Sequence, residues 1–386
     1  MIRPFSLIIL RFSPTQQCPI QTIDSGSERK LPLCLIAELV VARSNQIIMK
    51  ISHALALTFF LCSLSLGSQS HAQSEASTSS GGEYKPADRK ASRQVKAVLN
   101  YLLNQRGKGF ISGQTDLADA EWIKANTGKY PAILGMDFMH VPKRMGRDVK
   151  DTATAIDWYR QKRGLVTFQW HWSSPSGAEN PGSGFNTRNT TFDLAAALSD
   201  PNSSDYKGLI EDIDDVAAEM KKMSDAHVPI LFRPLHEAQG RWFWWGAKGS
   251  ENCVKLYKII FDRMTRHHRL HNLIWVWTAY PASQGKGDPA VWYPGDDFVD
   301  IIASDYNEKK QDYDDLVRLT AGKKMVALAE TMNAPDPSKV LNSTPWVYWV
   351  TWARRDWNKR SPDDMKQAIA HPLTITLDRL PDVSKW

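Results

Sequence analysis

The chain has 386 residues, 42% of them hydrophobic and 23% charged; these ordinary globular values exclude a chain that is disordered or fibrous throughout. A formal net charge of +6 is too small and too dispersed to predict a nucleic-acid partner. The length suits a single α/β barrel, which we take as the working hypothesis.

Residues 49–72 have the pattern of an export signal. A basic start at 49–50 precedes a thirteen-residue apolar run at 54–66, and residues 70–72 form an A-x-A-like cleavage site. A membrane anchor is the alternative, but it would need about 20 apolar residues. We therefore expect a signal peptide that is cleaved after residue 72, a secreted or periplasmic protein, and no membrane association once the signal is removed.

Residues 1–48 precede this signal without a clear periodic pattern, and we expect Met49 to be the true start. Removal of residues 1–72 takes away three of the four cysteines and leaves Cys253, so the mature chain is expected to form no internal disulfide. It also removes six Lys/Arg and three Asp/Glu, which lowers the net charge to +3. Stability must then come from the hydrophobic core.

Residues 73–85 follow as a small, polar and flexible linker. The catalytic domain is expected over residues 86–386. Because this domain accounts for nearly all of the mature chain, we expect no separate binding module, and we expect a monomer.

Eight short apolar or β-branched runs lie within this domain, and an amphipathic helical pattern follows most of them. Alternating strands and helices indicate parallel strands, and eight such units close a (β/α)8 TIM barrel. An open doubly wound sheet is the alternative, but the first run lacks the glycine-rich phosphate loop of such sheets. The runs are 110–115, 132–138, 165–172, 230–237, 273–278, 300–307, 325–331 and 346–352.

Two features lie between these runs. Residues 173–205 form the longest connection, and a loop of that length inside a compact domain is usually functional. Ser250 is expected to cap a helix that ends in the basic segment 266–269, because cations suit a helix C-terminus.

The ends of the runs mark a candidate site, because barrel enzymes carry their reacting groups at the C-terminal ends of the strands. Glu237 ends the fourth run and Glu330 lies at the end of the seventh. Two carboxyl groups facing each other across the barrel mouth suit retaining glycoside hydrolysis, at a separation of about 5–5.5 Å. We assign Glu237 as acid/base and Glu330 as nucleophile. A salt-bridged strand end is the alternative for either glutamate alone.

Neighbouring residues suit these two roles. Arg233 and the hydroxyl of Tyr306 are expected to keep Glu330 ionised by charge and hydrogen bonding. A drier, more apolar setting beside Trp242 is expected to keep Glu237 protonated.

His171 and His236 are candidate donors to sugar hydroxyls. Metal binding is the rival interpretation, but the sequence contains no ligand spacing such as H-E-x-x-H. We therefore expect no metal and no cofactor.

The chain has fifteen tryptophans, which is more than packing alone usually requires, and three of them lie within residues 240–246. Sugars present flat apolar faces that stack on such rings. Because the side chains of a consecutive run cannot all face one cleft, we expect Trp242 to line the site. One or two of the other tryptophans are expected to serve packing only.

Residues 233–246, Arg-Pro-Leu-His-Glu-Ala-Gln-Gly-Arg-Trp-Phe-Trp-Trp-Gly, closely resemble the β-mannanases of glycoside hydrolase family 26. The likeness covers about 86–386 and includes Phe-Ile-Ser-Gly-Gln in the first run, Gln-Trp-His-Trp in the third and Ala-Glu-Thr in the seventh. It implies a (β/α)8 barrel with the acid/base after strand four, at Glu237, and the nucleophile after strand seven, at Glu330. It further implies that four residues lie at or beside the cleavage subsite: His171, Trp242, Tyr306 and Trp352.

The leading hypothesis is therefore an endo-acting hydrolase of β-1,4-linked mannan, galactomannan or glucomannan that works by double displacement. The resemblance leaves open the same chemistry on another β-glycan, such as β-1,3-xylan or mixed-linkage glucan. A catalytically inactive barrel that only binds sugars is the hypothesis from another class. Such a binder has no need for two carboxylates with supporting His, Arg and Tyr.

Overall fold

The computed structural model describes residues 83–146, 148–280, 285–306 and 308–386, apart from the side chains of Tyr306 and Ser384. The expected signal peptide, the segment before it and most of the expected linker lie outside the described residues. Those assignments therefore stay predictions.

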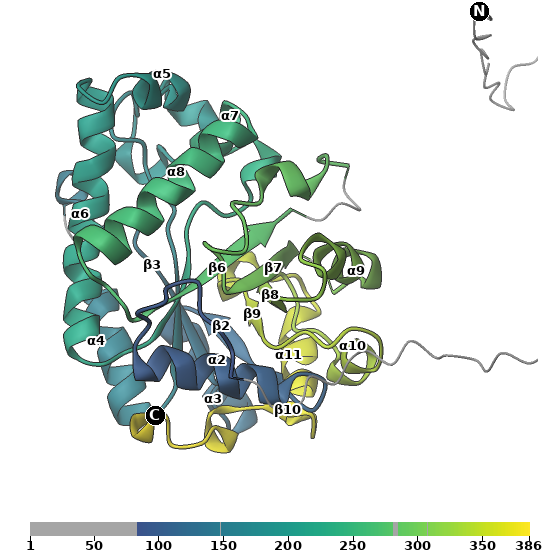
Figure 1. The fold of residues 1–386 in the computed structure, drawn as a ribbon. Coiled ribbons are helices and arrows are strands. Elements are labelled where there is room, and N and C mark those ends of the chain that lie inside the picture. Colours follow the sequence, from purple (N-terminus) through teal and green to yellow (C-terminus); the bar gives the residue numbers. More distant parts are fainter. Residues whose placement is uncertain (1–82, 147, 281–284, 307) are drawn as a thin grey trace, which may run out of the picture. The chain divides into compact units, whose positions relative to one another are not determined.

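Eight parallel strands close a barrel in the order β2-β3-β4-β5-β6-β7-β8-β9 (Figure 1). Gln114 of β2 closes the ring against Thr351 of β9. Each strand overlaps one of the eight predicted runs, so the predicted (β/α)8 barrel is confirmed and the open sheet is wrong. The strands are β2 (Gly113–Thr115), β3 (Ile133–Asp137), β4 (Leu165–Gln169), β5 (Ile230–Arg233), β6 (Leu273–Ala279), β7 (Ile301–Tyr306), β8 (Met325–Thr331) and β9 (Trp349–Thr351).

The first predicted run is divided between two sheets. β1 (Phe110–Ile111) pairs with β10 (Thr374–Ile375), and the residues after it enter the barrel as β2. Ser112 lies at the switch: its backbone N–H and its hydroxyl donate to the carbonyl of Ile375 at 3.0 and 2.9 Å. The two-stranded sheet therefore ties the C-terminal segment to the start of the barrel.

Helices surround the barrel (Figure 1), and the long ones bury apolar side chains. In α6, for example, Leu209, Ile213, Val216 and Met220 are buried at helical spacing. In the described part of the chain, none of the helices is long and apolar enough to cross a bilayer. The helices are α2 (Arg93–Gln105), α3 (Leu117–Thr127), α4 (Lys150–Asp157), α5 (Leu194–Ser199), α6 (Ser204–Asp225), α7 (Trp244–Ala247), α8 (Ser250–Asp262), α9 (Lys310–Leu319), α10 (Pro337–Ser343) and α11 (Ser361–Ala370).

Two local predictions need correction. The cap of α8 is Gly249, whose φ of 91° suits glycine, and Ser250 is the first helical residue. The predicted loop 173–205 contains α5, which begins where the carboxylate of Asp193 accepts hydrogen bonds from two backbone N–H groups of the first turn.

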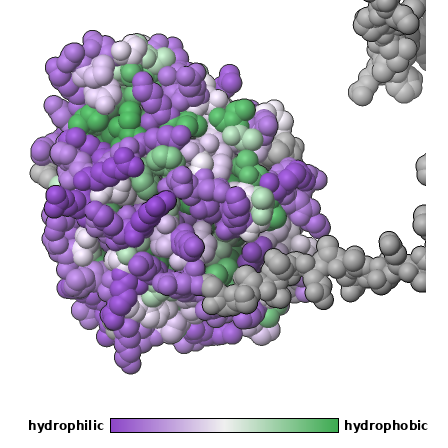
Figure 2. Space-filling view, viewed as in Figure 1, coloured by the Kyte–Doolittle hydropathy of each residue, from purple (hydrophilic) through white to green (hydrophobic). Residues whose placement is uncertain are grey.

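The large number of tryptophans has a packing explanation in part. The face shown in Figure 2 is mostly hydrophilic, as expected when apolar side chains fill the core. Ten tryptophans of the described residues are buried in the core, so packing accounts for more of them than the sequence suggested: Trp158, Trp170, Trp172, Trp244, Trp245, Trp275, Trp277, Trp292, Trp346 and Trp349.

Candidate active site

Glu237 lies in a strained turn directly after β5. Leu235 and Glu237 both have a φ of 54°, in the left-handed region that residues other than glycine rarely adopt. Such a turn persists where neighbouring contacts hold it, and the indole N–H of Trp245 donates to the carbonyl of His236 at 2.9 Å. Glu237 then precedes the 3-10 turn η5 (Ala238–Gly240). Packed aromatic side chains therefore fix the backbone of the candidate acid.

Two glycines allow the aromatic segment to approach this turn. A Cβ on Gly246 would lie 2.0 Å from the carbonyl oxygen of Ala238, so α7 packs directly against η5. A Cβ on Gly240 would lie 2.1 Å from the ring of Trp242. The ring therefore covers Gly240, and from there its N–H donates to Oε2 of Glu237 at 2.9 Å.

The three tryptophans of residues 240–246 have different environments. Trp244 and Trp245 are 1% and 0% exposed, and both donate their N–H groups to backbone carbonyls. Trp242 is half-buried, and its ring lies edge-to-face 4.9 Å from that of Tyr280. Of the three, Trp242 alone keeps exposed surface beside Glu237.

Glu237 is placed to act as an acid. Its burial and, to a smaller extent, the charges of Asp305 and Glu330 raise its pKa to about 8. The charge of Arg233 and the hydrogen bond from Trp242 act in the opposite direction. Burial thus favours protonated Glu237, in agreement with the expected dry setting, whereas the Trp242 N–H itself favours the carboxylate.

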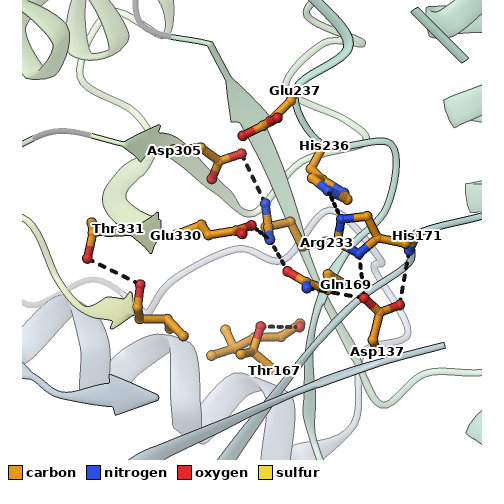
Figure 3. A network of polar contacts seen from close by, with 12 residues as sticks. Asp137, Thr167, Gln169, His171, Arg233, His236, Glu237, Asp305, Glu330 and Thr331 are labelled. Atoms are coloured by element: carbon orange, nitrogen blue, oxygen red, sulfur yellow. Dashed lines mark hydrogen bonds and ion pairs between the residues drawn. The ribbon is translucent and has the colours of Figure 1, made fainter. Parts of the chain in front are cut away.

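Arg233 is the last residue of β5, and its guanidinium contacts two other acidic side chains of the site (Figure 3). Its Nη1 lies 3.0 Å from Oδ2 of Asp305, and its Nη2 contacts both Oε1 of Gln169 and Oε2 of Glu330. Arg233 is 2% exposed and Asp305 is fully buried. These charges therefore interact more strongly than they would in water. The structure places Arg233 in an ion pair with Glu330.

An irregularity in β8 brings Asp305 and Glu330 together. The register between β7 and β8 is constant up to the pair Ser304 and Leu328. The next pair is Asp305 and Glu330, so Ala329 is an extra residue in β8. A bulge of this kind re-aims side chains at the end of a strand. Burial raises the pKa of Asp305 to about 7; the charge of Arg233 opposes this rise and that of Glu330 adds to it.

His171 and His236 form a second polar group beside Arg233 (Figure 3). Nδ1 of His171 lies 2.5 Å from Oδ2 of Asp137, and its Nε2 lies 3.2 Å from Nε2 of His236. Burial disfavours charge on His171, but the charge and hydrogen bond of Asp137, together with the charge of Glu330, outweigh it and raise the His171 pKa. Burial, then the charges of Arg233 and His171, lower the pKa of His236 well below its ordinary value. Within the described ranges, no three His, Cys, Asp or Glu side chains are grouped as metal ligands would be.

Three polar residues of this site were not among the predicted site residues. Asp137 and Gln169 are the last residues of β3 and β4, and Asp305 is the penultimate residue of β7. Asp305 lies near the end of the predicted run 300–307, so the strand-end criterion could have selected it. Asp137 and Gln169 lie inside the predicted runs 132–138 and 165–172, so only the strand ends seen in the structure identify them.

The family model described as "Glycosyl hydrolase family 26" matches residues 87–379. The chain belongs to glycosyl hydrolase family 26. This membership confirms the resemblance found in the sequence.

The relatives of this family 26 chain include a protein of Thermothelomyces thermophilus named mannan endo-1,4-beta-mannosidase. It is 38% identical over 309 residues, which cover 75% of this chain and 62% of that protein. The chain covers 53% and 50% of two further curated relatives, both from Piromyces sp..

Solved structures agree with the family assignment. A β-(1,4)-mannanase of Podospora anserina has a TM-score of 0.71 at 34% identity, and the match covers 79% of this chain and 72% of that one. A β-mannanase from a symbiotic protist of the termite Reticulitermes speratus, complexed with gluco-manno-oligosaccharide, has a TM-score of 0.69 at 29% identity. That match covers 77% of this chain and 97% of the protist protein.

Two residues that the family resemblance assigns to the site are described in part. Tyr306 ends β7, and its side chain lies outside the described residues. Trp352 follows β9 and is half-buried; its carbonyl accepts hydrogen bonds from Nε2 of Gln114 at 2.8 Å and from Nε1 of Trp357 at 2.9 Å. Both residues thus stand at strand ends on the same side of the barrel as Glu237.

Proposed function

We propose that this family 26 chain is a retaining, endo-acting glycoside hydrolase that cleaves β-1,4-mannosidic bonds. The observation that carries the proposal is the contrast between two carboxyl groups of one site. Glu237 is buried and has a pKa of about 8, whereas Glu330 forms an ion pair with Arg233. A protonated acid beside a carboxylate held by a cation is the pair that retaining hydrolysis requires.

In the first step, Glu237 donates its proton to the glycosidic oxygen while an oxygen of Glu330 forms a bond to the anomeric carbon and the bond to the leaving sugar breaks. In the second step, Glu237 takes a proton from water. The water oxygen attacks the anomeric carbon and releases the carboxylate of Glu330. Two inversions at one carbon give net retention.

Further side chains are proposed to contact the sugar at the cleavage subsite. The exposed part of the Trp242 ring suits stacking against a sugar face. His171, whose ring lies next to His236 in Figure 3, suits hydrogen bonding to hydroxyl groups. The full proposed set of substrate contacts is His171, Arg233, His236, Trp242, Tyr306 and Trp352.

The mannan substrate is supported by the names of the family 26 relatives. The relative from Thermothelomyces thermophilus and the solved structure from Podospora anserina are both named for action on β-1,4-mannan. We propose mannan, galactomannan and glucomannan as substrates on this basis.

The test is mass spectrometry of the soluble products after incubation of the purified chain with linear mannan, galactomannan, β-1,3-xylan and mixed-linkage glucan. A ladder of manno-oligosaccharides is expected, and proton NMR of the first product is expected to show the β-anomer. Mannobiose alone would contradict endo action. Products from another glycan only would replace the substrate, and no products from any glycan would favour a sugar-binding barrel.

We also propose that residues 49–72 direct export and are cleaved off after residue 72, so that the mature chain begins with the 73–85 linker. We further propose that the mature protein is a monomer. The support is the basic, apolar and small-residue pattern of that segment. N-terminal sequencing of protein recovered outside the cytoplasm tests the cleavage site, and light scattering during gel filtration tests the monomer. An N-terminus at or before Met49 would contradict the cleavage, and a dimer mass would contradict the monomer.

A further inference from the structure

Asp137 is a carboxylate surrounded by hydrogen-bond donors. It accepts from the backbone N–H groups of Met139 at 2.9 Å and His171 at 3.0 Å, and from Nε2 of Gln169 at 3.2 Å. Nδ1 of His171 lies 2.5 Å from the same group. A carboxyl group with this many donors is ionised, because the neutral form would have to give up an acceptor position. Nδ1 of His171 therefore carries a hydrogen.

Charge balance determines whether Nε2, the second ring nitrogen of His171, also carries a hydrogen. The side chain of Asp137 is only 21% exposed, and in the described part of the chain its ion-pair partner is His171. A largely buried anion without a cation would be costly, so the pair is stable when His171 is an imidazolium. Its Nε2–H then donates to the bare Nε2 of His236 at 3.2 Å. His236 is 1% exposed, and burial lowers its pKa, so it is neutral. With Nε2 as the acceptor, its hydrogen lies on Nδ1, which is buried without a hydrogen-bond partner among the described residues.

Several charged groups act on His171 from the surrounding elements. Asp137 of β3 and Glu330 of β8 favour its charge, whereas Arg233 of β5 opposes it. Asp151 of α4 adds a second carboxyl group behind Asp137, because it accepts the backbone N–H of Asp137 at 3.3 Å. The other groups that face His171 are His236, Asp305 and the ring edges of Phe185 and Phe243.

We propose that Asp137 is a positioning residue that fixes the hydrogens of the histidine pair, with His171 as a charged donor and His236 as a neutral acceptor. A sugar hydroxyl can accept from the Nε2–H of His171 in place of His236, so the charged form of His171 is the form that can donate to a substrate. Hydrogen bonds of this kind strengthen in the transition state of glycoside hydrolysis. The inference rests on the proposed function, since it assigns a task within the same site.

The first experiment needs no substrate. Long-range proton–nitrogen NMR of the histidine rings reports which nitrogens carry hydrogen at each pH. In the unmodified protein, both nitrogens of His171 are expected to be protonated at pH 6, and His236 is expected to be protonated on Nδ1 only. In D137N the midpoint for His171 is expected about 1 to 3 pH units lower, because a neighbouring opposite charge is lost. A neutral His171 in the unmodified protein at pH 6 would overturn the inference, even if D137N did not fold.

The second experiment measures kcat/KM against pH. If the charged form of His171 is the active one, D137N moves the alkaline limb to lower pH and lowers kcat/KM at pH 7 by about tenfold or more. An alkaline limb of kcat/KM that is unchanged in D137N would contradict the positioning role of Asp137.

Asp88→Asn is the matched control, because Asp88 forms a similar carboxylate–imidazole pair with His271, at 2.7 Å, outside the site. D88N is expected to leave the titration of His171 and the pH profile unchanged. If the unmodified protein has no hydrolase activity, the proposed function fails, and the NMR experiment still decides whether Asp137 sets the protonation of the histidines.

Discussion

Asp305 and Glu330 are register partners across β7 and β8, and the guanidinium of Arg233 pairs with both of them. One buried positive charge therefore pairs with two carboxyl groups and can neutralise only one of them. Negative charge remains next to Glu237. After burial, this charge is the main reason why the pKa of Glu237 rises to about 8. The state of the proposed acid thus depends on a residue from a different strand.

Replacing Asp305 by Asn should make Glu237 a stronger acid. Removal of a neighbouring negative charge lowers the pKa of Glu237, so the alkaline limb of kcat/KM should move to lower pH by about one unit. The measurement is a pH profile on soluble manno-oligosaccharide. Asp300→Asn is the matched control, because Asp300 is a buried carboxyl group that directly precedes the same strand; it should reduce stability and leave the limb in place.

Replacing Trp242 by Phe should move the same limb in the opposite direction. The indole N–H donates to Glu237 and favours its charged form, so its loss should raise the pKa and shift the limb up by about one unit. Trp244→Phe, which removes an N–H bonded to the backbone carbonyl of Trp172, serves as the comparison and should leave the limb in place. A downward shift in W242F would show that solvent entry outweighs the lost hydrogen bond.

Glu237→Ala should separate substrates by their leaving groups. On mannan, kcat/KM should fall by about 10²- to 10⁴-fold, the usual contribution of general acid catalysis. On an aryl mannoside with a strongly acidic phenol, glycosyl transfer needs no proton, and the loss should be much smaller. Equal losses on the two substrates would argue against the acid role of Glu237.

Glu330→Ala should abolish turnover and preserve folding. Removing a nucleophile that acts as part of a unit costs on the order of 10⁴-fold or more. Calorimetric titration with mannohexaose should show affinity close to that of the unmodified protein, because the remaining sugar contacts persist. Measurable turnover at more than about one hundredth of the original rate would remove Glu330 from the nucleophile role.

Gly246→Ala should disturb the site through the backbone. The new Cβ would meet the Ala238 carbonyl at 2.0 Å, so η5 and Glu237 must shift, with a loss of about 1–3 kcal/mol in stability and a lower kcat. Gly128→Ala is the control: its φ of 75° strains any side chain, but open space surrounds it. G128A should lose about 1–2 kcal/mol and retain full kcat. An unchanged kcat in G246A would show that the turn tolerates displacement.

The sequence was sufficient to predict the barrel and to place Glu237 and Glu330 at the ends of two of its strands. Strands and helices have periods of two and 3.6 residues, which are local properties, so eight alternating units could be counted without any tertiary information. Glu237 and Glu330 followed from the rule that barrel sites lie at strand ends. The family resemblance depended on a contiguous motif, residues 233–246, and was equally local.

Tertiary structure alone decided how the site is charged. The extra residue Ala329 sets Asp305 against Glu330, and a register irregularity of this kind has no periodic signal. The same holds for Trp242, whose hydrogen bond opposes the effect that its apolar ring suggested. A pKa is the balance of burial, charges and hydrogen bonds contributed by segments far apart in the chain, so no local pattern in the sequence could reveal it.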